Sequence, residues 1–103
     1  MKQHLYEVTV QHLADTQGNP STYSEALQFQ AGNHDDIFKI LEKLQASQLL
    51  DEESTKAFVI GLKLFSEVML ENKELSLFKE FLPQFAQFMK SLKQTVKAQS
   101  EEQ

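Results

Sequence analysis

Residues 4–13 of the chain read HLYEVTVQHL, and polar and apolar side chains alternate along this stretch. Tyr6, Val8 and Val10 fall on one face of an extended segment, because successive side chains in a strand point to opposite sides. Aromatic and β-branched residues in a two-residue period are typical of a β-strand. We therefore expect a strand over about residues 3–13.

A second alternating stretch follows a segment rich in turn-forming residues. Residues 14–22 read ADTQGNPST, and a Gly-Asn-Pro sequence does not fit inside a regular element. Alternation returns over residues 24–31, which read SEALQFQA, and we expect Gly32 to end this strand. The two stretches predict an N-terminal antiparallel β-hairpin with a long loop.

The spacing of apolar residues changes to three and four after Gly32, which predicts helices for the rest of the chain. Three or four α-helices are expected, since Pro83 removes a backbone hydrogen bond and either ends or kinks a helix. Their ranges are about 34–47, 52–71, 75–82 and 83–97. The segment 52–71 is apolar on most faces, so we expect a central helix in which Gly61 allows close packing.

These elements define an α+β fold in which the hairpin packs on the helices. The chain has 103 residues, which is the length of one ordinary domain, and 41% of them are hydrophobic. We expect a single domain over residues 1–97. Residues 98–103 lack apolar side chains and are expected to form a frayed polar tail.

The composition excludes several classes of protein. The chain has no cysteine, which excludes disulfides and thiolate metal sites and fits a reducing compartment. Its net charge is −5, and it has ten lysines and no arginine, so we expect no nucleic-acid binding. An acidic chain without an apolar run of about 20 residues is also not expected to bind or span a membrane. Cytoplasmic location is the resulting expectation.

The densest polar cluster, residues 33–36, lies where the first helix is expected to begin. Asn33 is the predicted capping residue, and acidic side chains in a first helical turn interact favourably with the helix dipole. A histidine beside two carboxylates also suits a divalent metal ion or a small ligand. His34, Asp35 and Asp36 are therefore a candidate ligand site, although capping alone accounts for both acids. No cofactor motif, complete metal site or catalytic residue set is recognised.

Four phenylalanines recur at steps of three and four in the last helical region: Phe78, Phe81, Phe85 and Phe88. They predict either a core stripe or a partly exposed face for a partner. An isolated two-stranded hairpin is marginally stable and has two open edges. Pairing of these edges, or of the phenylalanine stripe, across a two-fold axis would cover the edges and stabilise the hairpin. We take the four phenylalanines as a candidate partner surface and expect a homodimer.

Lysines form a strip on the last helix, at positions 90, 93 and 97. Such a strip is either the ordinary exposed side of a helix or a contact for an acidic partner. The sequence leaves these alternatives open.

Three blocks, GNHDDIFKILEKL, GLKLFSEVMLEN and LFKEFLPQFAQFMKSLK, follow the N-terminal MKQHLYEVTVQHLADTQGNP. Together they resemble a family of small bacterial proteins that is catalogued only as a domain of unknown function. The resemblance covers about residues 1–93 and implies a stand-alone bacterial domain. It carries no established activity and transfers no catalytic residues. It marks residues 33–36 and 61–69 as typical of the family.

These observations predict a small cytoplasmic protein–protein interaction or regulatory module that associates with itself. The alternative is a binder of a small ligand or divalent metal ion at the start of the first helix. An enzyme is not expected, because no catalytic constellation is present.

Overall fold

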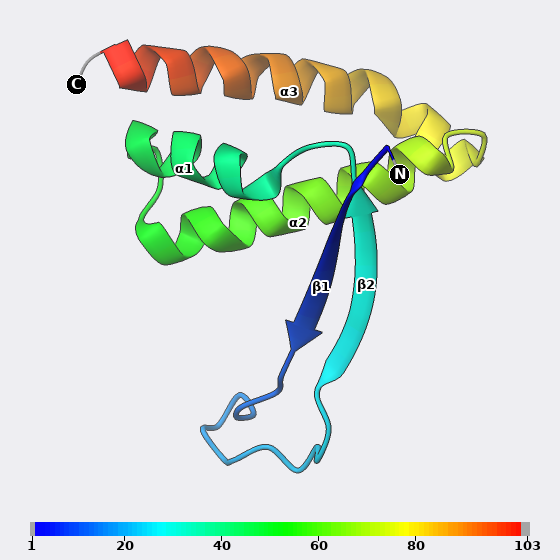
Figure 1. The fold of residues 1–103 in the computed structure, drawn as a ribbon, viewed down its shortest axis with the longest axis vertical. Helices are drawn as coiled ribbons and strands as arrows, with labels where there is room; N and C mark the ends of the chain where they lie inside the picture. The colour runs from blue at the N-terminus through cyan, green and yellow to red at the C-terminus, as the bar shows by residue number, and fades with distance from the viewer. Residues whose placement is uncertain (1, 102–103) are drawn as a thin grey trace. The chain divides into compact units, whose positions relative to one another are not determined.

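A computed structural model describes residues 2–101 of the chain. It contains two strands followed by three helices, which confirms the α+β fold class (Figure 1). The chain forms two compact units that divide between His34 and Asp35, the first holding the strands and the second the helices. Within residues 2–101, no helix has both the length and the apolar character that a bilayer span requires.

The first unit is an antiparallel hairpin of β1 (His4–Val10) and β2 (Leu27–Asn33). Val8 pairs with Phe29 in its register, and the alternating apolar residues of both strands therefore share one face. This confirms the predicted hairpin, with strands that stop short of the predicted ends at the loop.

Gly32 lies inside β2, so the predicted end of the strand at this residue is wrong. Gly32 pairs with Leu5, and the ladder continues to the pair of His4 with Asn33. Glycine weakens a strand only modestly, and here the residues before and after Gly32 also pair with β1.

Asp15 organises the centre of the loop between the strands. Its carboxylate accepts hydrogen bonds from the backbone N–H groups of Gln17 and Asn19, both at 2.9 Å. Gly18 adopts a φ of +86° in this turn, a conformation that residues with a Cβ rarely adopt. The bonds from Asn19 lower the pKa of the Asp15 carboxyl below its ordinary value, and the bond from Gln17 adds to them.

The second unit consists of α1 (Ile37–Ser47), α2 (Glu52–Glu71) and α3 (Ser76–Glu101). α1 packs against both longer helices and lies between them in Figure 1. α1 covers only part of their length, so near the short turn that joins them α2 and α3 face each other directly (Figure 1). The predicted range of the second helix matches α2.

Aspartates cap the first two helices. The Asp36 side chain accepts a hydrogen bond from the N–H of Phe38 at 3.1 Å, and that of Asp51 accepts one from Ser54 at 2.7 Å. The prediction that Asn33 caps the first helix is wrong, and α1 begins later than residue 34. A capping side chain accepts hydrogen bonds from backbone N–H groups two or three residues further on. In α1 those groups belong to Phe38 and Lys39, which places the cap at Asp36.

α3 is one continuous helix that contains Pro83 and extends to Glu101. The predicted division into helices over 75–82 and 83–97 is therefore wrong. Pro83 is exposed, so water reaches the backbone carbonyl that proline leaves unpaired, and the apolar side chains before and after it stay on one stripe.

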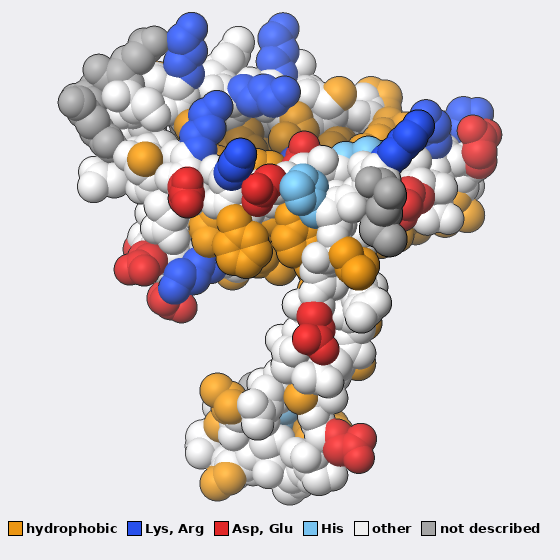
Figure 2. Space-filling view, viewed as in Figure 1, with side chains coloured by type: hydrophobic (Ala, Val, Ile, Leu, Met, Phe, Trp, Pro, Cys, Tyr) orange, Lys and Arg blue, Asp and Glu red, His pale blue; other side chains and the backbone are white. Residues whose placement is uncertain are grey.

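The core of the helical unit is small. Its buried hydrophobic residues are Ile37, Leu44, Val59, Met69 and Val96. Many large hydrophobic side chains remain exposed instead, and they show at the surface in Figure 2. A Cβ at Gly61 would meet no atom within 4 Å, so the close packing expected at this glycine is absent.

Candidate functional site

The polar cluster at the start of the first helix is engaged in contacts within the chain. Asp36 caps α1, and Asp35 Oδ2 lies 2.8 Å from Lys63 Nζ on α2. His34 is exposed and immediately precedes the boundary between the two units. Over residues 2–101, no group of three or more His, Cys, Asp or Glu side chains is placed to hold a metal ion. A ligand site at His34, Asp35 and Asp36 stays a prediction.

Phenylalanine rings fill the space where α2 and α3 face each other. Phe65 on α2 is their centre, and its ring centroid lies 6.1–6.4 Å from those of Phe78, Phe81 and Phe85. The rings meet edge-on or tilted, the arrangements that the charge distribution of aromatic rings favours. We call Phe65, Phe78, Phe81 and Phe85 the aromatic cluster.

The aromatic cluster is only partly covered by the chain. Phe78 and Phe85 are half-buried, but Phe65 is 44% exposed and Phe81 is 42% exposed. Other exposed apolar side chains occur on the same two helices and their connecting turn: Val68, Leu70, Leu75 and Leu77. These side chains leave apolar area on α2, α3 and their connecting turn that the described residues do not cover.

The structure divides the predicted set of four phenylalanines. Phe78, Phe81 and Phe85 join the aromatic cluster, whereas Phe88 contacts Phe58 on α2 at a centroid distance of 6.4 Å. Phe65 is a member of the aromatic cluster that the sequence does not single out. Its only signal was the apolar character of 52–71 on most faces, which does not say which residue of the helix would meet α3.

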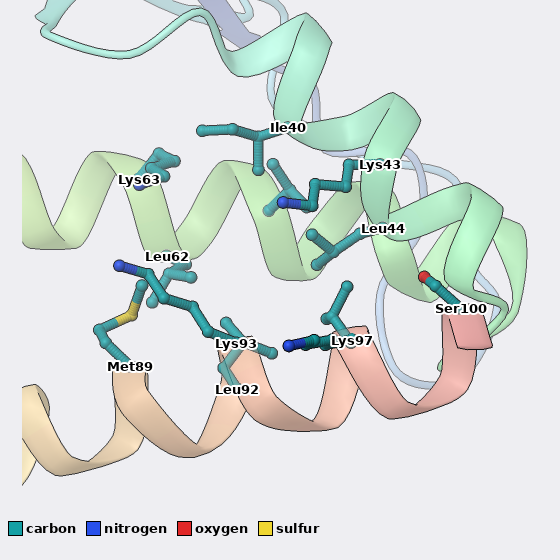
Figure 3. A pocket seen from close by; sticks show the side chains of 12 residues that line it. Ile40, Lys43, Leu44, Leu62, Lys63, Met89, Leu92, Lys93, Lys97 and Ser100 are labelled. Carbon is teal, nitrogen blue, oxygen red and sulfur yellow. The ribbon is translucent and has the colours of Figure 1, made fainter. Parts of the chain in front are cut away.

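A cavity of about 590 Å³ lies at the other part of the helical unit, where α1 is packed between α2 and α3. Hydrophobic side chains from all three helices line it, among them Leu44, Val59 and Met89. Four lysines also line it: Lys43, Lys63, Lys93 and Lys97. Figure 3 shows the labelled lysines reaching toward the same space from different helices. The sequence predicts the lysine strip, of which Lys93 and Lys97 line the cavity, but it does not predict the cavity, because the lining comes from three separate segments.

A histidine–serine pair lies in the hairpin loop. His12 Nδ1 is 2.6 Å from Ser21 Oγ, and the His12 ring packs edge-on against Tyr23. A base beside a hydroxyl is one part of an activated nucleophile, which also needs a group that orients the base. None of the residues that the structure describes makes a hydrogen bond to His12 Nε2, and the contact with Ser21 joins two parts of the loop.

Two strands followed by three helices define a small α+β protein, and its described side chains include no cluster of three or more His, Cys, Asp or Glu that could hold a metal ion. The chain belongs to the family DUF3861, described as a domain of unknown function with a solved structure, whose model matches residues 4–94.

A crystal structure of a protein of unknown function from Pectobacterium atrosepticum is similar to this chain. The two share 40% sequence identity, with a TM-score of 0.76, over 89% of this chain and 98% of that one. A comparison with curated proteins finds no match. These findings confirm the resemblance to a bacterial family of unknown function, and they assign no activity.

Proposed function

We propose that this chain is a cytoplasmic, non-enzymatic interaction module that works as a homodimer, with the aromatic cluster at the centre of the interface. One observation carries the proposal: Phe65 and Phe81 contact each other, yet each leaves more than two-fifths of its surface exposed. Large apolar patches on a single chain are rare and mark interaction surfaces.

A second copy of this chain is the occupant that such a surface fits best. In a two-fold dimer the same patch meets itself, so it must be complementary to itself. A patch of aromatic and aliphatic side chains satisfies this condition, whereas a patch of one charge would repel its copy. Aromatic anchors also contribute the largest share of binding energy in most interfaces.

The small core gives a second reason for association. Only five hydrophobic residues are buried in the described part of the chain, while Val10, Leu27 and Phe29 of the hairpin are each more than two-fifths exposed. A two-stranded sheet is marginally stable by itself and gains from added strands or packing. A second copy would supply apolar contacts to both units.

Two features support the remaining parts of the proposal. The absence of cysteine fits a reducing compartment such as the cytoplasm. The His12–Ser21 pair, which comes nearest to a catalytic arrangement, lacks an orienting partner among residues 2–101. A module that acts through contacts requires no such partner.

Light scattering of the purified chain tests the proposal. The wild-type protein is expected to have twice the 11.9 kDa mass of one chain across micromolar concentrations. Phe81→Glu places a charge in the aromatic cluster and is expected to give the mass of one chain.

Phe38→Glu is the matched control, because Phe38 is 67% exposed on α1 and lies outside the aromatic cluster. This variant is expected to keep the double mass, with circular dichroism verifying that both variants are folded. A wild-type mass of one chain, or equal loss of mass in both variants, would contradict the proposed interface.

A further inference from the structure

The cavity between the three helices has an apolar interior and a border of lysines. Leu44, Val59 and Val96 are buried at its wall, and no aspartate or glutamate lines it. The chain has 15 acidic residues against ten lysines, so a lining with four lysines and no acid differs sharply from its composition. On the face drawn in Figure 2, lysine side chains gather beside hydrophobic ones along the helical unit.

Among the side chains that the structure describes, one of these four lysines has an acidic partner. Lys63 pairs with Asp35 at 2.8 Å. Lys43, Lys93 and Lys97 form no ion pair with any residue that the structure describes. Like charges repel each other, and an anion held among these ammonium groups would offset that repulsion.

We infer that this cavity binds a single-chain amphiphile with an anionic head group, of the fatty-acid class. The alkyl chain occupies the apolar interior, and the head group meets the ammonium groups of Lys43, Lys93 and Lys97. Lysine suits this position because its hydrocarbon stem packs on apolar surface while its charge stays at the edge. A volume of about 590 Å³ lies within the range of small-molecule sites.

The volume of the cavity, about 590 Å³, favours an alkyl chain over a helical acidic peptide. An α-helical peptide is about 10–12 Å across and needs a long open groove. This cavity is lined by side chains of α1, α2 and α3 (Figure 3). None of its lining residues belongs to the aromatic cluster, so the inference does not depend on the proposed dimer interface.

Calorimetric titration with octanoate, decanoate and dodecanoate, each below its micelle-forming concentration, tests the inference. Each added CH2 group is expected to lower Kd about four-fold, as burial of the chain requires. Dodecyltrimethylammonium has the same tail with a cationic head, and it is expected to bind at least about ten-fold more weakly than dodecanoate.

Charge-reversal variants locate the head group. Lys43→Glu and Lys93→Glu are each expected to raise the Kd of dodecanoate at least about ten-fold. Lys39→Glu and Lys90→Glu are the matched controls, since they lie on the same two helices outside the lining, and both are expected to stay within about two-fold of wild type. Thermal unfolding verifies that all four variants are folded.

Several results would overturn the inference. They are the absence of dodecanoate binding, an affinity that does not change with chain length, and equal binding of the anionic and cationic amphiphiles. Binding to phosphatidylglycerol vesicles without binding to free dodecanoate would assign the lysines to a membrane surface instead. A change in light-scattering mass with unchanged dodecanoate affinity in Lys93→Glu would assign the cavity wall to a second copy.

Discussion

Asp51 links the stability of α2 to pH. The hydrogen bonds from Ser54, chiefly the one from its backbone N–H, lower the pKa of the Asp51 carboxyl below its ordinary value of 3.8. A group whose folded-state pKa is lowered contributes stability above its unfolded pKa and loses it as the pH falls through the folded value. The contribution of this cap is therefore complete at neutral pH and disappears in acid.

Asp51→Asn isolates this effect, because asparagine also caps helices but does not titrate. Wild type is expected to lose its advantage over Asp51→Asn as the pH is lowered from about 6 to about 3. Urea unfolding of both proteins across this range measures the difference. A difference in urea midpoint that stays constant with pH would show that the Asp51 carboxylate does not act through its charge.

Gly61 offers a simple test of the open space on α2. A Cβ at this position would meet no atom within 4 Å, and the residue has ordinary helical backbone. Gly61→Ala is therefore expected to raise the free energy of unfolding by about 0.5–1 kcal/mol, through helix propensity alone.

Ala57→Gly on the same helix is the matched control for Gly61→Ala. Ala57 is also exposed, so this change is expected to lower the free energy of unfolding by a similar amount. Urea unfolding measures both variants. A lower free energy of unfolding for Gly61→Ala would show that other atoms pack against this position in the native protein.

At the scale of elements, Pro83 is the clearest conflict between local preference and observed structure. α3 begins at Ser76, about two turns before it, and continues to Glu101, although proline is about 3 kcal/mol less favourable than alanine inside a helix. Pro83→Ala restores one backbone hydrogen bond and is expected to raise the free energy of unfolding by about 1–3 kcal/mol.

Gln87→Ala, one turn further along α3, is the control for Pro83→Ala. It changes an exposed side chain without adding a backbone bond and is expected to shift stability by a few tenths of a kcal/mol at most. Urea unfolding followed by circular dichroism measures both. A less stable Pro83→Ala protein would show that α3 needs the local geometry of proline to pack.

The elements themselves could be predicted because each depends on local periodicity. β1, β2 and α2 appear where the spacing of apolar residues placed them. The errors fall where a longer-range contact competes with a local preference. Gly32 is extended because Leu5 pairs with it, and α3 passes Pro83 because one apolar stripe continues on both sides.

The candidate sites could be predicted only in part, because each is assembled from distant segments. The stripe on α3 gave Phe81 and Phe85, but Phe65 required knowledge of how α2 meets α3. The lysine strip gave Lys93 and Lys97, whereas Lys43 comes from α1. One helix shows its own periodicity in the sequence, but the partner that faces it is set by tertiary packing.

At the scale of the whole molecule, the proposed dimer would couple folding to association. If the dimer supplies apolar burial that one chain lacks, the folded state must be favoured by concentration, since association removes only folded chains from the equilibrium. For a chain of this length, a hundred-fold increase in concentration is expected to raise Tm by roughly 7 °C.

Phe81→Glu should abolish this dependence as well as lowering Tm, because a monomer unfolds without a change in molecularity. Phe38→Glu should retain the wild-type dependence, since Phe38 lies outside the aromatic cluster. Calorimetric scans at several concentrations measure all three proteins. A constant wild-type Tm would show that the helical unit is stable without a partner, and the exposed rings of Phe65 and Phe81 would then need another explanation.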